Sequence, residues 1–114
     1  MKKTLAIAAL GVLGAGLLAG GALAQEGTFV RKGKELIVLS VRDGKLYCTR
    51  ASDGFEMCNG MTRQPDGTWK GRNMRHPAMP RFMKFNGTVT FTDSGLNIRG
   101  CALGICKGED WRAQ

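Results

Sequence analysis

The chain has 114 residues and a formal net charge of +8, from 17 Lys and Arg against 9 Asp and Glu. This length excludes a large enzyme built of two domains around a deep interdomain cleft. The composition differs between two parts of the chain. Residues 1–24 hold 16 hydrophobic residues and no acidic residue, whereas residues 25–114 hold 15 Lys and Arg against 9 Asp and Glu.

The first 24 residues have the pattern of a bacterial signal peptide. A short basic start, Met1-Lys2-Lys3, precedes an uncharged stretch over 4–24 that ends in Ala22-Leu23-Ala24, an A-x-A cleavage site. An uncleaved anchor is the alternative, since 21 uncharged residues can span a bilayer. Five glycines and the A-x-A site favour cleavage. We therefore expect residues 25–114 to form one periplasmic or secreted domain.

The mature part is expected to consist of short strands. Its 12 glycines fall between apolar runs, which is typical of strands joined by tight turns. The expected strands are 28–32, 35–41, 45–50, 55–61, 68–72, 82–85, 88–92, 96–101 and 105–111. Asn86-Gly87, Asp43-Gly44 and Asp66-Gly67 predict turns, and segment 75–81, with two prolines, predicts a loop. This succession favours an all-β antiparallel meander that closes into a small barrel.

The spacing of the four cysteines predicts two cross-strand disulfides. A three-residue hairpin loop over 52–54 places Cys48 opposite Cys58, and Arg50 opposite Glu56 as a charge pair. A two-residue turn at 103–104 places Cys101 opposite Cys106. Both would be non-hydrogen-bonded pairs, whose Cα atoms lie within disulfide reach. Structural zinc is disfavoured by the nine residues between Cys48 and Cys58, and a redox dithiol by the lack of a C-x-x-C motif.

Several segments of the chain carry a family resemblance. Residues 43–47, 67–71, 74–77 and 96–104, with Cys106 and Trp111-Arg112, resemble a family of small exported bacterial proteins of uncharacterised function. Its members have a G-x-W-x-G segment and an ending of the form L-x-V/I-x-G-C-x-L-G…C…W-x-R. The resemblance implies a lipocalin-like antiparallel barrel around a cavity and a hydrophobic ligand. It supplies no catalytic residues.

Few residues could support catalysis. His76 is the only histidine, and no P-loop or dinucleotide-binding motif is present. A catalytic site would require a pocket in which His76 lies beside a carboxylate. We therefore expect a protein that is not an enzyme and has no cofactor.

Methionine and histidine gather in one segment, residues 74–83. Thioether and imidazole groups are ligands that suit Cu(I), and Met74, His76, Met79 and Met83 could supply them. The alternative is that these flexible thioethers fill an irregular end of the barrel and that His76 is an exposed loop residue.

Residues 63–84 are strongly basic, with six Lys and Arg against one acid, Asp66. In an exported protein the accessible anions are lipid headgroups, lipopolysaccharide and cell-wall polymers rather than nucleic acid. The candidate contacts are Arg63, Trp69, Lys70, Arg72, Arg75, Arg81 and Lys84. The alternative is a solvated surface without a specific site.

These observations predict a monomeric, exported, non-catalytic binding or envelope-associated protein. We expect it to capture a small hydrophobic or amphipathic anionic ligand through the barrel mouth and the basic segment. A periplasmic Cu(I)-binding protein that uses the methionine and histidine cluster is the alternative.

Overall fold

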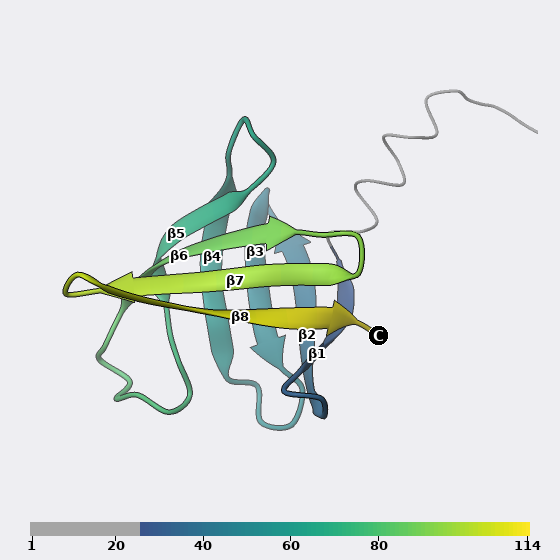
Figure 1. Cartoon of the computed structure of the whole chain (residues 1–114), viewed down its shortest axis with the longest axis horizontal. Coiled ribbons are helices and arrows are strands. Elements are labelled where there is room, and N and C mark those ends of the chain that lie inside the picture. The colour runs from purple at the N-terminus through teal and green to yellow at the C-terminus, as the bar shows by residue number, and fades with distance from the viewer. Residues whose placement is uncertain (1–25) are drawn as a thin grey trace, which may run out of the picture.

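The computed structural model describes residues 26–114, so the predicted leader, residues 1–24, lies outside the described part. Within that part the chain forms eight antiparallel strands, and no helix long and apolar enough to cross a membrane is present. The strands are β1 (Gly27–Arg31), β2 (Glu35–Arg42), β3 (Lys45–Arg50), β4 (Glu56–Arg63), β5 (Trp69–Met74), β6 (Phe85–Phe91), β7 (Gly95–Ala102) and β8 (Ile105–Ala113). Each strand pairs with the next, and β1 pairs with β8 to close a barrel (Figure 1). The predicted antiparallel barrel is confirmed.

The up-and-down order sends alternate connections to opposite ends of the barrel. The β2–β3, β4–β5 and β6–β7 turns share one end with the beginning of β1 and the end of β8. The β1–β2, β3–β4, β5–β6 and β7–β8 connections lie at the other end, which we call the mouth. The longest of these is the β5–β6 loop, residues 75–84, which contains the predicted loop 75–81.

The end opposite the mouth is filled by apolar side chains. Alternation along each strand points every second residue inward, as in β2, where Ile37 and Leu39 are buried while Leu36 and Val38 are exposed. The buried core cluster includes Phe29, Ile37, Leu39, Leu46, Met61, Trp69, Val89, Leu96 and Trp111. Trp111 is 1% exposed.

The turn predicted at Asn86-Gly87 is wrong. Both residues lie inside β6, where Asn86 pairs with Cys101 and Gly87 with Gly100. The glycine serves packing, because a Cβ at position 87 would lie 2.1 Å from Cε of Met74. The chain reverses instead through the β5–β6 loop, so the expected strand over 82–85 does not form and only Phe85 of it belongs to β6. The turn at Asp43-Gly44 is confirmed, since both residues have positive φ between paired Arg42 and Lys45.

Both predicted disulfides are confirmed. Cys48 is bonded to Cys58 and Cys101 to Cys106, with Cα atoms 4.6 and 4.1 Å apart, as non-hydrogen-bonded pairs require. Because disulfides persist where thiols are not kept reduced, they indicate a non-reducing environment. The first bridge is fully buried in the barrel, whereas the second lies on the outer side of the β7–β8 hairpin.

The predicted register around the first disulfide is correct only at the cysteines. Cys48 faces Cys58, but Thr49 faces Glu56, so Met57 is an extra residue that forms a β-bulge. The expected pair of Arg50 and Glu56 is therefore absent, since the backbone N–H of Arg50 donates to the carbonyl of Phe55 at 2.8 Å. Because of the bulge, two consecutive residues, Met57 and Cys58, are both buried in the interior of the barrel.

Removal of either disulfide is expected to destabilise the barrel, and removal of the buried one more strongly. Chain entropy assigns about 2–3 kcal/mol to closing each short loop. The double substitution of Cys48 and Cys58 by Ala also leaves a cavity in the core, whereas the same change at Cys101 and Cys106 alters a partly exposed site. Urea unfolding of both double variants measures the difference. Greater destabilisation on loss of the Cys101–Cys106 bridge would contradict this burial argument.

Candidate functional site

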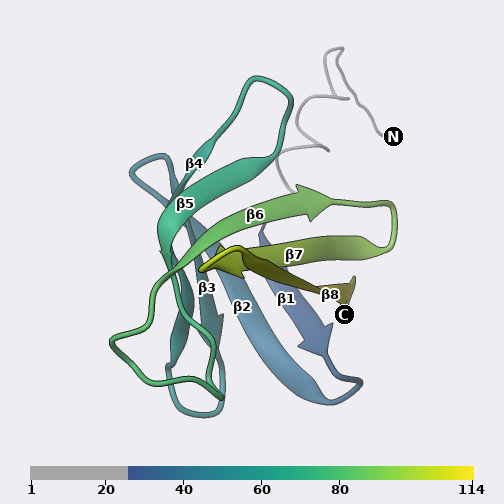
Figure 2. The ribbon, with the colours of Figure 1, turned by 60° about the vertical axis from the view of Figure 1, so that its left-hand side comes forward.

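A cavity of about 470 Å³ opens at the mouth, between the β5–β6 loop and the β7–β8 hairpin. Figure 2 shows the course of the backbone in these two segments. Its size lies within the range of small-molecule sites. Most of its wall is apolar, and four polar side chains interrupt it. The lining residues are Met57, Met74, Arg75, His76, Met79, Met83, Phe85, Ile98, Gly100, Ala102, Leu103, Ile105, Lys107 and Glu109.

The β7–β8 hairpin builds one wall by strand alternation. Gly100 and Ala102 of β7 line the cavity. They leave room for it because glycine has no side chain and that of alanine is a single methyl group. From the tip of β8 inward, Ile105, Lys107 and Glu109 line it in turn, followed by buried Trp111. One face of β8 therefore changes from apolar at the rim, through two charges, to aromatic at the core.

The predicted methionine and histidine cluster is brought together. Met74, His76, Met79 and Met83 all line the cavity, and the bulge in β4 adds Met57. Across residues 26–114, no three His, Cys, Asp or Glu side chains gather to hold a metal ion, so a metal here would depend on thioethers. The same flexible thioethers make an adaptable apolar wall.

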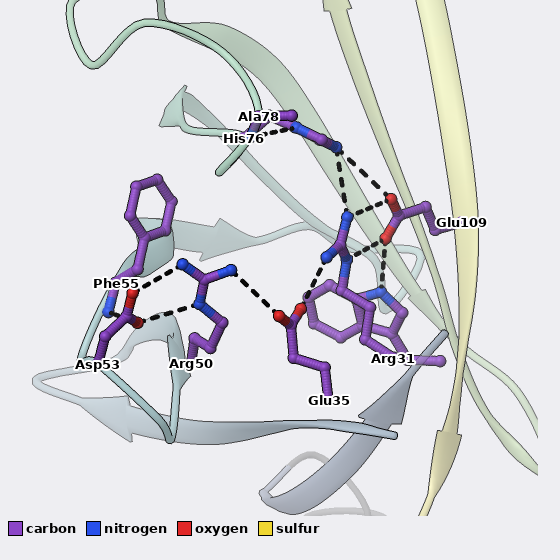
Figure 3. A network of polar contacts seen from close by, with 9 residues as sticks. Arg31, Glu35, Arg50, Asp53, Phe55, His76, Ala78 and Glu109 are labelled. Carbon is purple, nitrogen blue, oxygen red and sulfur yellow. Dashed lines mark hydrogen bonds and ion pairs between the residues drawn. The ribbon is translucent and has the colours of Figure 1, made fainter. Parts of the chain in front are cut away.

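A buried guanidinium lies beside the cavity. Arg31, at the end of β1, is 4% exposed. Its Nε and Nη2 donate to the two carboxylate oxygens of Glu109 at 2.7 and 2.8 Å, and its Nη1 donates to Glu35 at 2.7 Å (Figure 3). Trp111 donates its indole N–H to Glu109 at 3.0 Å. The hydrogen bonds that Arg31 donates lower the pKa of Glu109 to about 2, and the same bonds raise the pKa of Arg31.

The network continues to the β3–β4 connection. Glu35 accepts a second bond, from Arg50 at 3.1 Å, and Arg50 forms a bidentate pair with Asp53 at 3.0 and 2.7 Å. Burial alone would raise the pKa of Glu35, but its bonds to Arg31 and Arg50 lower it. The bond from Arg50, with a second from the backbone of Phe55, lowers the pKa of Asp53 to about 2.

His76 connects the β5–β6 loop to this network. Its Nδ1 accepts the backbone N–H of Ala78 at 3.0 Å. Its Nε2 lies 3.6 Å from Glu109 and 3.4 Å from Nη2 of Arg31. His76 is therefore at a cavity and beside a carboxylate, as a catalytic site would require. The Nδ1 atom is engaged by Ala78, and the Nε2 atom faces the ion pair of Arg31 and Glu109.

Two cations of the cavity wall have no acidic partner. Within the described chain, neither Arg75 nor Lys107 forms an ion pair, whereas the charge of Glu109 is used by Arg31. The Nε–H of Arg75 is buried and finds no acceptor among these residues. Buried donors in proteins are almost always paired, so this one marks a place where an acceptor would be favourable.

The other residues of the predicted basic segment are dispersed. Trp69 belongs to the core at 3% exposure, and Lys70 and Arg72 line a separate polar groove of about 600 Å³ across β4, β5 and β6. Arg81 and Lys84 are exposed on the β5–β6 loop, and Arg63 is exposed at the end of β4. Of the seven candidates only Arg75 lines the cavity.

Sequence reasoning did not single out Arg31, Ile105, Lys107 or Glu109 as members of this site. An available signal was the alternation of 105, 107, 109 and 111, which assigns Lys107 and Glu109 to the same face as the core tryptophan. Comparison of the chain with models of protein families, with curated proteins and with solved structures found no match. The function is therefore inferred from the cavity itself.

Acid is expected to weaken the barrel as the pH falls from about 4.5 towards 2. The pKa of Glu109 is lowered from 4.5 to about 2, so its contribution to stability is complete above pH 4.5 and is lost as the pH falls through the lowered value. Glu109→Gln should reduce this dependence. At pH 7 it should destabilise the barrel by about 3 kcal/mol, because it takes one carboxylate from a buried guanidinium.

Urea unfolding at pH 7 and pH 3, followed by tryptophan fluorescence, measures both effects. Glu56→Gln is the control, since its carboxylate lies 3.7 Å from exposed Arg42 and should contribute less than about 1 kcal/mol. The interpretation fails if the wild-type chain and Glu109→Gln lose the same stability between the two pH values.

Proposed function

We propose that this chain is an exported, non-catalytic binding protein that captures a small amphipathic anion at the mouth of its barrel. The observation that carries the proposal is the cavity of about 470 Å³, with mostly apolar walls and two cations without acidic partners. An apolar tail fits walls of methionine, isoleucine and phenylalanine. A carboxylate or similar head group fits Arg75 and Lys107.

The charge of the cavity favours an anion over a neutral ligand. Glu109 is its one acidic lining residue, and the bidentate contact with Arg31 neutralises it. Arg75 and Lys107 then leave a net positive wall, in a partly enclosed space where charge interactions are stronger than in water. We infer that head-group contacts select the ligand and that the thioether walls accept tails of differing shape.

Export and a monomeric state are parts of the same proposal. The two disulfides suit the periplasm or the outside of the cell, and with the leader pattern they support export from a bacterial cell. The pairing of Phe29 with Ala113 and of Val30 with Arg112 closes the barrel between its first and last strands, in keeping with a monomer.

Decanoate binding tests the proposal, with decanol as its uncharged counterpart. We expect decanoate to bind more tightly, and Arg75→Gln and Lys107→Gln each to weaken its binding about tenfold through loss of a charged hydrogen bond. Ala102→Leu should weaken both ligands by filling the cavity. Calorimetric titration of the purified domain provides the measurement.

Arg72→Gln is the matched control, because it removes the same charge three residues away in the polar groove. Its affinity for decanoate should equal that of the wild-type chain. Equal binding of decanol and decanoate, or an equal loss on Arg72→Gln, would refute a cavity that selects anions.

Cu(I) binding is the second candidate, favoured by the gathering of Met57, Met74, Met79 and Met83 on one cavity. The environment of His76 favours the first candidate, because its Nδ1 accepts from Ala78 and its Nε2 faces a guanidinium at 3.4 Å. Anaerobic titration against a copper chelator tests this function. If copper is the cargo, the double substitution His76→Ala with Met79→Leu should lower the affinity, and an unchanged affinity would eliminate the cluster as a site.

A further inference from the structure

Large apolar side chains are exposed around the opening of the cavity. Leu103 at the tip of the β7–β8 hairpin is 90% exposed, and Ile105 beside it is 66% exposed. On the β5–β6 loop, Phe82 is 84% and Met79 is 40% exposed. Both segments project on the same side of the barrel (Figure 1). We call these four residues the rim.

The leucine at the hairpin tip is unfavourable in two respects. Leu103 has φ of 54° in a two-residue turn whose second residue, Gly104, has φ of 79°. Glycine, asparagine and aspartate are typical of such turns, and other residues in the left-handed region cost roughly 1 kcal/mol. An exposed leucine also leaves its apolar surface in water. Leu103 therefore destabilises the turn and also exposes apolar surface to water. Both costs point to a role other than folding.

The two segments that carry the rim contain cations and no acidic residue. Residues 74–84 contain Arg75, Arg81 and Lys84, and residues 99–107 contain Arg99 and Lys107, while neither segment contains Asp or Glu. Arg81, Lys84, Arg99 and Lys107 are exposed. Apolar tips with flanking Lys and Arg suit the interface of an anionic bilayer, where apolar groups enter the acyl region and cations remain among the head groups.

We propose that the rim docks on the surface of an anionic lipid bilayer, with Phe82 and Leu103 inserted, so that the cavity opens towards the membrane. This inference extends the proposed function, because it names where an amphipathic ligand is collected or delivered. The Cys101–Cys106 bridge supports it, since it fixes the strands immediately behind the hairpin tip. The rim also surrounds an opening rather than forming a continuous apolar patch, which favours a fluid lipid surface over a shaped protein partner.

Binding to vesicles tests the docking surface. We expect the chain to sediment with vesicles of phosphatidylcholine containing 30 mol% phosphatidylglycerol, and to bind vesicles of phosphatidylcholine alone much more weakly. Phe82→Ser should weaken binding to the anionic vesicles about tenfold, through loss of buried apolar area. Leu103→Asn, which suits the turn, should weaken it while stabilising the hairpin. Arg81→Gln and Lys84→Gln should each cost about fivefold.

Val38→Ser is the matched control for Phe82→Ser, because Val38 is an apolar residue 41% exposed on the outer face of β2. It should bind vesicles as the wild-type chain does. Insertion is followed directly with Phe82→Trp, whose fluorescence should be quenched by brominated acyl chains, while that of Val38→Trp should not. The native tryptophans, Trp69 and Trp111, are buried at 3% and 1% exposure and give a constant background.

Several outcomes would overturn the docking proposal. These are unchanged vesicle binding on Phe82→Ser, an equal loss on Val38→Ser, or equal binding to neutral and anionic vesicles. A lipid-free dimer in sedimentation velocity that Phe82→Ser abolishes would assign the rim to a second copy of the chain instead. Decanoate binding without vesicles tests the cavity separately, because Phe82 does not line it.

Discussion

The arrangement of the mouth depends on one buried charge, the guanidinium of Arg31. A guanidinium that is 4% exposed is tolerable only when carboxylates and hydrogen bonds replace its hydration. Glu109 supplies two oxygens from β8 and Glu35 supplies one from the start of β2. This requirement fixes β8 against β1 where the barrel closes, and through His76 it also positions the loop that covers the cavity. Because Arg31 neutralises the carboxylate of Glu109, the remaining charges of the cavity wall, on Arg75 and Lys107, are positive.

The features predicted correctly are those that depend on neighbours in sequence. A turn of known length fixes which residues face each other, so Cys101 and Cys106 could be paired by counting outward from Leu103-Gly104. Alternation in segments such as 88–92 and glycine punctuation were sufficient for most of the strands, because every pairing but one joins consecutive strands. The methionine and histidine residues of segment 74–83 were recognised as a cluster for the same reason, since a single loop carries most of them.

The features that were missed depend on contacts between distant segments. Asn86-Gly87 has the composition of a turn, but Gly87 is required where the side chain of Met74 crosses it. The bulge at Met57 is not encoded by any local pattern, because an added residue in the β3–β4 loop and the bulge compensate each other and restore the pairing of Cys48 with Cys58. Arg31 and Glu109 are 78 residues apart, so nothing local identifies them as partners.

The closing contact between β1 and β8 also constrains the order of assembly. Seven strand pairings join neighbours in sequence, whereas the eighth joins Phe29 to Ala113 and Val30 to Arg112. A chain that emerges from its N-terminus first presents β1 as an open edge until the last strand arrives. Arg31 lacks its bidentate partner during the same interval. Loop-closure entropy opposes this long-range pairing more than the others, so we expect the barrel to complete its seam and to satisfy its buried charge together, late in folding.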